Sequence, residues 1–202
     1  MPHTRWVGSG SMSIPAGSEF TTSAGNLSRM TAYPLRTFGD PVLKQRAREV
    51  EEITGDLIPL VHGMYETMEA EEGVGLAAPQ VGVRKRLFTY DLHEGDGPNV
   101  VINPEIVEMS GEQVDSEGCL SVPGFRFEIV RADFVIMRGL DLDGNEVILE
   151  GDDLLARMIQ HEIDHLDGVL VLDRIDPEVR REALREMRNR ELPALSTGPS
   201  DR

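Results

Sequence analysis

The stretch DDLLARMIQHEIDHLDG, residues 152–168, predicts the helix on which the fold and the chemistry of this chain are centred. Apolar residues recur in it at the spacing expected for the buried face of a helix: Leu155, Ile159, Ile163 and Leu166. Gly168 follows, and glycine is common just after a helix end. We therefore expect a central helix from about Asp152 to Leu166.

Two histidines on this helix are spaced for metal binding. His161 and His165 are four residues apart, so they lie on one face and both rings can turn toward one ion. Glu162 lies about 100° further around the helix axis, where its carboxylate can flank an open coordination position without being a ligand. From this pattern alone, a metal site and a chance pair of solvated histidines are equally open interpretations.

The single cysteine supports the metal site. One cysteine in 202 residues cannot form an internal disulfide. Cys119 could be a small buried apolar residue, which is the usual role of a free cysteine. However, it lies in the loop-like stretch EGCLS, residues 117–121, among small and polar neighbours. Two imidazoles and one thiolate provide the three protein ligands and the one open position that are typical of a catalytic divalent-metal site.

A third segment, GVGLAAPQ at residues 73–80, completes a set of three short blocks. The other two are EGCLS at residues 117–121 and QHEIDH at residues 160–165. With these blocks in this order, the chain resembles the peptide deformylase family. The similarity extends from about Tyr33 to about Asn189, and none of the three blocks departs from the pattern of the family.

The resemblance implies the chemistry of the site. Cys119, His161 and His165 would bind one divalent ion, expected to be Fe²⁺, for which Zn²⁺, Ni²⁺ or Co²⁺ could substitute. Glu162 would act as general base toward water and then as general acid toward the departing amine. The reaction would remove the formyl group from the N-terminal formylmethionine of newly synthesised polypeptides and release formate.

The resemblance also implies which groups stabilise the transition state and hold the peptide. The side-chain amide of Gln80 and the backbone N–H of Leu120 would donate hydrogen bonds to the developing oxyanion. Taken alone, Gln80 is better interpreted as a surface amide at a turn, but its place at the end of the glycine-rich block reverses that preference. Val74, Gly75 and Gly118 would offer backbone groups to an extended peptide, because a missing side chain lets main chain approach main chain.

Selectivity for methionine would come from an apolar pocket. Its candidates are Val74, Leu120 and Met158, the last of which lies three residues before His161 and so on the same helical face. Met158 could also be an ordinary core residue. Arg126 matches a family arginine near the peptide, whereas a solvated surface arginine is its plainer interpretation.

A charged pair is expected behind the metal ligands. Asp164 lies between the two histidines in the sequence, and Arg131 is its candidate partner. Such a pair would help to orient the ligands from outside the coordination sphere.

Composition limits the class of protein. A chain of 202 residues with 40% hydrophobic content is sufficient for one domain with a substantial core. The net charge of −16 and the pI of about 4.6 argue against binding of DNA or of an anionic membrane. No apolar run approaches the roughly 20 residues of a membrane span. We expect a cytoplasmic protein.

The chain is expected to have three parts. Residues 1–29 lack sustained periodicity and are predicted to be a disordered arm, in part a cloning scar, a misassigned start or, as the weaker alternative, a transit peptide. Residues 30–192 would form the catalytic domain, and residues 193–202 a flexible tail. Asp40 and Pro41 resemble the start of a short helix, with Asp as its cap.

The pattern between the helices predicts strands. Four runs rich in β-branched and aromatic residues are expected to be extended: 87–90, 100–102, 127–130 and 134–137. The dipeptide Asp143-Gly144 predicts a hairpin turn. Strands grouped before the metal helix, with helices on either side, indicate an α+β fold. We expect antiparallel or mixed sheets packed around the central metal-binding helix, followed by a C-terminal helix.

That last helix, from about Pro177 to Arg190, alternates arginine with glutamate and has an apolar stripe of Val179, Ala183 and Met187. A surface helix with alternating charge is the favoured interpretation. The alternative, which the resemblance suggests, is a ribosome-docking element.

Two rival functions are considered. A metallopeptidase with the same two histidines and glutamate would draw a third ligand from downstream, but no histidine follows His165. A non-catalytic metal-binding or ribosome-associated protein on the same scaffold would need neither Glu162 nor Gln80. Both residues are present, which favours the hydrolase.

Overall fold

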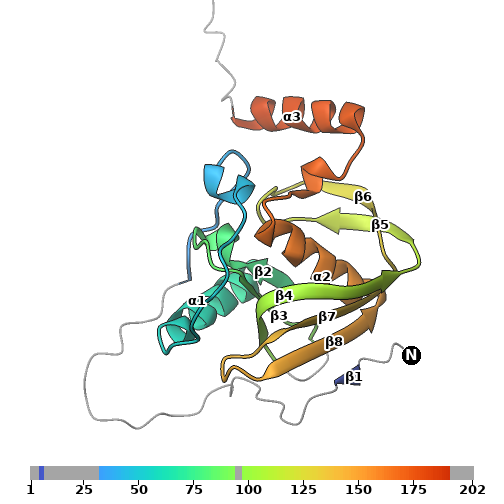
Figure 1. Cartoon of the computed structure of the whole chain (residues 1–202). Coiled ribbons are helices and arrows are strands. Elements are labelled where there is room, and N and C mark those ends of the chain that lie inside the picture. The colour runs from blue at the N-terminus through green and yellow to red at the C-terminus, as the bar shows by residue number, and fades with distance from the viewer. Residues whose placement is uncertain (1–4, 7–31, 94–96, 192–202) are drawn as a thin grey trace, which may run out of the picture.

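A computed structural model describes residues 5–6, 32–93 and 97–191, and an α+β fold is observed (Figure 1). Three α-helices are described: α1 (Leu57–Ala70), α2 (Asp153–Leu166) and α3 (Pro177–Glu191). Three short 3-10 helices are also described: η1 (Pro41–Lys44), η2 (Ala78–Val81) and η3 (Val171–Asp173). The tail predicted at 193–202 lies outside the described residues, and so does the arm predicted at 1–29 except for Arg5 and Trp6.

Every pairing between the named strands is antiparallel, and an isolated parallel bridge joins Arg48 to Lys85. The larger sheet has six strands in the order β1-β8-β7-β4-β3-β2. Its strands are β1 (Arg5–Trp6), β2 (Gly75–Ala77), β3 (Leu87–Tyr90), β4 (Asn99–Ser110), β7 (Phe134–Leu140) and β8 (Glu146–Asp152). The second sheet is a hairpin of β5 (Gln113–Gly118) and β6 (Arg126–Arg131).

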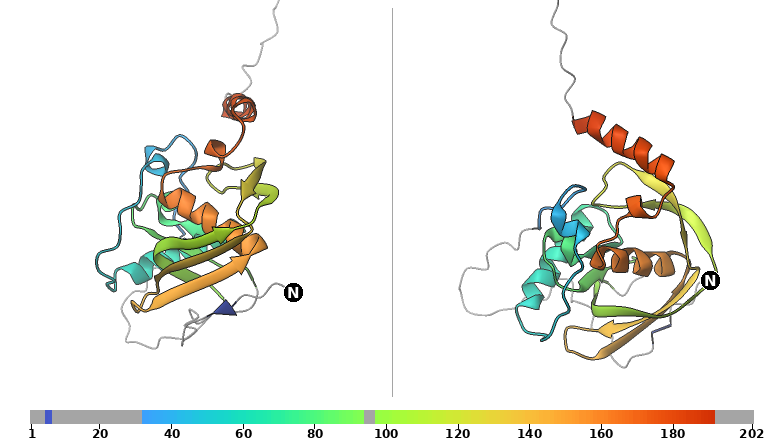
Figure 2. Two further views of the ribbon diagram at one scale, coloured as in Figure 1. Left: turned by 45° about the vertical axis from the view of Figure 1, so that its right-hand side comes forward. Right: turned by 45° about the horizontal axis from the view of Figure 1, so that its top comes forward.

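The metal helix occupies the centre of the fold, as the sequence predicted. Two views show α2 between the six-stranded sheet and the β5–β6 hairpin (Figure 2). Its apolar face packs with Phe88, Val101 and Met137 of the sheet in one buried cluster. Ile159 is fully buried there. The helix therefore presents one face to the core and the opposite side to the hairpin.

The predicted strands are present, but β1, β2 and β5 were not foreseen. Strand β1 lies in the arm predicted to be disordered and pairs with β8. Strand β5 is mostly polar, with the sequence QVDSEG, and its residues Val114, Asp115 and Ser116 are exposed. Such a strand has no hydrophobic alternation to reveal it, and pairing with β6 is what makes it extended. Strand β2 has three residues, too few for a periodic signal.

The helix boundaries follow local signals. The side chain of Asp40 accepts a hydrogen bond from the Val42 N–H at 2.9 Å, with Pro41 as the first residue of η1, as expected. The predicted hairpin turn is present, and Gly144 in it has φ +79°. The helix α3 spans Pro177–Glu191, which confirms the predicted range of about Pro177 to Arg190. Of its predicted apolar stripe, however, Val179 is 44% exposed, because α3 meets the core only from Ala183 onward.

None of the described helices is both long and apolar enough to cross a membrane.

Gly168 follows the end of α2 and lies against the backbone of Lys44, the last residue of η1. It has φ +77°, and an added Cβ would lie 2.9 Å from the carbonyl carbon of Lys44. The Gly168→Ala variant should therefore lose about 2–4 kcal/mol of unfolding free energy, because backbone strain and overlap with main chain add together.

Gly144→Ala is the matched control. Gly144 has φ +79°, and its nearest neighbour to an added Cβ is a side-chain atom of Ile53 at an ordinary 3.8 Å. Only the backbone strain applies there, at about 1–2 kcal/mol. Urea unfolding at equal metal content measures both variants, and equal losses would contradict the packing argument.

Candidate metal centre and substrate pocket

Three potential metal ligands meet beside α2. Cys119 follows directly after β5, whereas His161 and His165 lie one turn apart on α2. The Sγ of Cys119 lies 3.2 Å from Nε2 of His165, and the two Nε2 atoms lie 3.2 Å apart. All three donor atoms lie within 4.8 Å of one another. The structure thus brings the three predicted ligands together from segments that are far apart in sequence.

The donor set fits a tetrahedral divalent ion. In such a site, Zn–N bonds of about 2.0–2.1 Å and a Zn–S bond of about 2.3 Å place the donors about 3.3–3.6 Å apart. The observed 3.2 Å separations are close to that spacing. Three protein donors leave a coordination position for water or substrate, which is the pattern of catalytic rather than structural sites.

Glu117 holds His161 in the orientation that metal binding needs. Its Oε1 lies 2.6 Å from Nδ1 of His161, so that Nε2 is turned toward the other ligands. The same carboxylate accepts hydrogen bonds from Arg131 at 2.7 and 3.1 Å and from Arg157 at 2.9 Å. Carboxylate partners of this kind fix the tautomer and the ring direction of a metal-binding histidine.

This role of Glu117 is not predicted by the sequence. Glu117 is the first residue of the EGCLS block, and its position two residues before Cys119 is the one local signal for it. Its partners come from β6 and α2, so the contact depends on the packing of the hairpin against the helix.

The predicted pair of Asp164 and Arg131 is present. Nη1 of Arg131 donates to Oδ2 of Asp164 at 2.5 Å, and Arg174 also donates to this carboxylate. Arg131 therefore bridges two buried carboxylates, those of Asp164 and Glu117, and links the helix to the hairpin.

The charges in this network set the protonation of the ligands. Burial acts to raise the pKa of Glu117, but hydrogen bonds from His161 and Arg131 hold that pKa well below its usual range. Burial acts to lower the pKa of His161, but contacts with Cys119 and Glu117 raise it well above its ordinary value. Burial lowers the pKa of His165. These directions favour the neutral form of His165 and the protonated form of His161, and a histidine must be neutral to bind an ion.

Glu162 is also a buried carboxylate, but its pKa is shifted in the opposite direction to that of Glu117. It is 2% exposed, and burial raises its pKa to about 7. Its Oε2 has no hydrogen-bond partner among the described residues. Its Oε1 approaches the backbone of Gly75 so closely that a Cβ there would overlap it. A buried carboxylate with a free oxygen and a pKa near neutrality is suited to accept a proton from water.

Gln80 lies in η2 and Leu120 directly follows Cys119, and both line the same pocket as Cys119 and His161. The Oε1 of Gln80 accepts a hydrogen bond from the Ala77 N–H at 2.8 Å, and its Nε2 donates to Oγ of Ser121 at 3.3 Å. Gln80 is 1% exposed, so its interpretation as a surface amide is wrong. Its amide is held in one orientation, with a second N–H available to a ligand.

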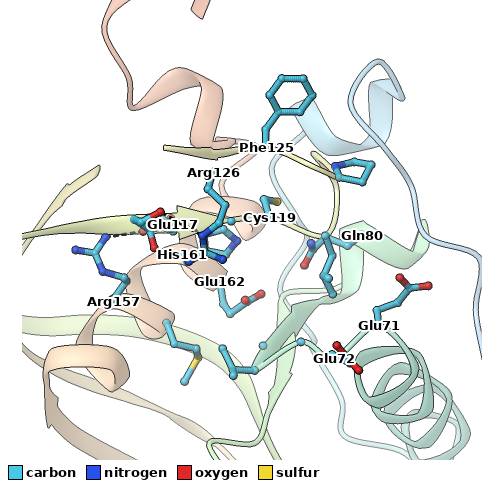
Figure 3. Close-up of a pocket in the computed structure, with 18 of the residues that line it drawn as sticks. Glu71, Glu72, Gln80, Glu117, Cys119, Phe125, Arg126, Arg157, His161 and Glu162 are labelled. Atoms are coloured by element: carbon cyan, nitrogen blue, oxygen red, sulfur yellow. Dashed lines mark hydrogen bonds and ion pairs between the residues drawn. The ribbon is translucent and has the colours of Figure 1, made fainter. Parts of the chain in front are cut away.

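A pocket of about 770 Å³ opens onto this centre (Figure 3). All the predicted substrate residues line it: Val74, Gly75, Gly118, Arg126 and Met158. So do Gln80, Leu120, Cys119, His161 and Glu162, whereas His165 lies behind them. The sequence analysis missed lining residues whose positions depend on the fold: Glu71, Glu72, Leu154 and Pro123 to Phe125.

Two of the predicted substrate residues have structural contacts as well. Met158 is 3% exposed and packs in the core cluster, so it serves the core and also faces the pocket. Arg126 is exposed, but its guanidinium donates to the carbonyl oxygen of Ser116 at 2.7 Å and to its Oγ at 3.2 Å. Those bonds lay the arginine along the hairpin at the edge of the pocket.

The Glu117→Gln variant tests the role of this carboxylate. We expect affinity for a divalent ion to fall about 10–100-fold, because an amide cannot neutralise the two arginines and orients His161 poorly. Competition with a chromophoric chelator measures the affinity. Glu128→Gln, at an exposed position on β6, is the control and should bind as the unmodified protein does. Equal affinity in both variants would rule out the orienting role.

Comparisons with known proteins agree with this geometry. The chain matches the model described as polypeptide deformylase over residues 32–181. It is 49% identical over 152 residues to the peptide deformylase of Carboxydothermus hydrogenoformans, covering 75% of this chain and 99% of that relative.

Solved structures give the same result. A peptide deformylase from Legionella pneumophila has a TM-score of 0.75 at 38% identity, covering 81% of this chain and all of that one. A peptide deformylase from Ehrlichia chaffeensis in complex with actinonin has the same TM-score and identity, covering 81% of this chain and 99% of that one. By its sequence blocks, its fold and these similarities, this chain belongs to the polypeptide deformylase family.

Proposed function

We propose that Cys119, His161 and His165 hold a ferrous ion in this metal-dependent hydrolase and that Glu162 is its acid–base catalyst. The enzyme removes the N-formyl group from the formylmethionine of newly synthesised polypeptides and releases formate. One observation supports the assignment above all. The three donor atoms lie within 4.8 Å of one another, beside a buried carboxylate with an unpaired oxygen, at the wall of a pocket.

The residues of the chain have separate tasks in the reaction. When bound, the divalent ion supplies Lewis-acid chemistry that lowers the pKa of water and makes hydroxide available near neutral pH. Glu162 accepts the proton of the attacking water and then gives it to the amine that leaves as the C–N bond breaks. The amide of Gln80 and the backbone N–H of Leu120 donate to the oxygen on which negative charge develops.

Separate parts of the pocket bind the first side chain of the peptide and the peptide backbone. Val74, Leu120 and Met158 provide apolar surface for methionine. The backbone at Gly75 and Gly118 can pair with an extended peptide, since neither residue has a side chain to hold it away. This arrangement supports a preference set chiefly by the first residue of the substrate.

The identity of the ion and the location of the protein are further parts of the proposal. The two-nitrogen, one-sulfur donor set binds several divalent ions, and Fe²⁺ is proposed on the family resemblance. A cytoplasmic location is proposed because the thiol of Cys119 must stay reduced to act as a ligand.

Formate release tests the function directly. Protein loaded anaerobically with Fe²⁺ should release formate from a formyl-Met tripeptide, and Glu162→Gln should lower kcat/KM by about 10²–10⁴-fold. The amide keeps the volume of the side chain but cannot accept the proton. Metal content, measured on the same samples, should be unchanged because Glu162 is not a proposed ligand.

Two further samples separate the rival functions. Glu128→Gln, the exposed control, should keep full activity. An unformylated tripeptide should remain intact, whereas its cleavage would indicate a metallopeptidase. No formate from the unmodified, Fe²⁺-loaded protein would leave the non-catalytic interpretation standing.

We also propose that α3 contacts the ribosome. Most of its arginines are exposed, among them Arg181 and Arg185, and Val179 adds an apolar side chain at 44% exposure. A helix that presents cations beside an apolar residue is suited to an anionic surface, even on a chain whose net charge is −16.

Charge reversal tests this contact without removing the helix. The double variant Arg181→Glu/Arg185→Glu should pellet severalfold less with ribosomes at low salt, and the difference should shrink as salt is raised. The control reverses two exposed arginines outside α3, Arg46 and Arg138. Equal retention of the two double variants would end the proposal.

A further inference from the structure

The loop between Leu120 and β6 forms one rim of the pocket. Pro123, Gly124 and Phe125 all line the pocket, and Gly124 has φ +77°. Figure 3 shows Phe125 at the outer end of the pocket, with its ring directed away from Glu162 and Cys119. The ring of Phe125 is therefore on the side of the pocket that faces away from Glu162.

The C-terminal end of α3 makes contact with this rim. The guanidinium carbon of Arg190 lies 4.3 Å from the centroid of the Phe125 ring, which is a cation–π distance. Its Nη1 donates to the carbonyl oxygen of Gly124 at 3.4 Å. An added Cβ at Gly124 would lie 2.8 Å from the same nitrogen, so the arginine lies directly against the loop. One side chain thus contacts two consecutive residues of the rim.

Both ends of this contact are held in place. On α3, Arg190 donates to Oε1 of Glu186 at 2.5 Å, one turn earlier, which fixes the plane of the guanidinium. The helix itself is anchored through Ala183 and Met187, which pack in the cluster that contains Cys119. On the loop, Phe125 stacks on Phe127 with ring centroids 6.2 Å apart and planes at 13°.

The matched family model ends at residue 181, so its match does not include Glu186 and Arg190. The side chains of Arg190 and Glu186 are both about half exposed, so their ion pair contributes little to the stability of the fold. Its effect is to orient the guanidinium of Arg190.

We propose that Arg190 is a positioning residue: through Phe125 and Gly124 it holds the rim loop in the conformation that binds the peptide residues following the formylmethionine. This inference rests on the deformylase function proposed above. The contact acts on substrate binding and not on the chemical step, because the rim lies at the end of the pocket away from Glu162. Loss of the contact should weaken binding of longer substrates and leave the shortest substrate unaffected.

The Arg190→Ala variant is the first test, in the Fe²⁺-loaded enzyme. We expect KM for a formyl-Met tripeptide to rise about 3- to 10-fold, the effect of losing one partly exposed cation–π contact and one weak hydrogen bond. The kcat for that substrate, the metal content and the Tm should stay unchanged. The kcat/KM for formylmethionine amide, which lacks the later residues, should also stay unchanged.

Three further variants separate positioning from general loss of structure. Arg190→Lys keeps a cation over the ring and should restore part of the KM effect. Arg188→Ala removes an arginine of the same helix that has no ion pair or hydrogen bond with any described residue, and should match the unmodified enzyme. Combining Arg190→Ala with Phe125→Leu should add little to the KM of Phe125→Leu alone, because the two residues act as a pair.

The outcomes decide between the ideas. An unchanged KM for the tripeptide in Arg190→Ala, or an equal fall in kcat/KM for both substrates, overturns the positioning role. Full additivity with Phe125→Leu overturns it as well. Absence of formate release from the unmodified enzyme contradicts the proposed function instead, so the two failures are distinguishable.

Discussion

The buried carboxylate of Glu117 joins the β5–β6 hairpin to the metal helix, and the geometry of the site depends on that joint. It accepts hydrogen bonds from Arg131, Arg157 and His161, which come from β6 and α2. Removal of one partner from such a buried network leaves a charge uncompensated, at a cost of about 3–5 kcal/mol. The same bonds aim His161 at Cys119 and His165. Packing of the hairpin on the helix and assembly of the metal centre are thus one event.

Two glutamates in this centre have opposite environments and therefore opposite uses. Glu117 is surrounded by cations, which keep it ionised and fixed in place. Glu162 is equally buried, but its Oε2 has no partner among the described residues, and burial raises its pKa to about 7. The first carboxylate is suited to support a ligand, and the second to exchange a proton with substrate or water. Neighbouring groups, not residue type, make the distinction.

The pocket combines parts with different origins. Residues of the three blocks shared with the family line it, whereas the loop at its rim is in contact with the end of α3. The helix α3 contacts the rim through Arg190 and has exposed arginines at Arg181, Arg185 and Arg188, so it links an outer surface to the substrate pocket.

Local patterns in the chain were sufficient for the central helix and the α+β class, and they also indicated the three candidate metal ligands. His161, Glu162 and His165 share one helix, so their relation follows from helical geometry alone, and the three family blocks supplied Cys119. Strand β5, the support by Glu117 and the contact of Arg190 with the rim could not be read in this way. Each depends on contacts between segments that are far apart in the chain and that form only when the tertiary structure is assembled. The hydrophobic periodicity within one segment does not predict such contacts.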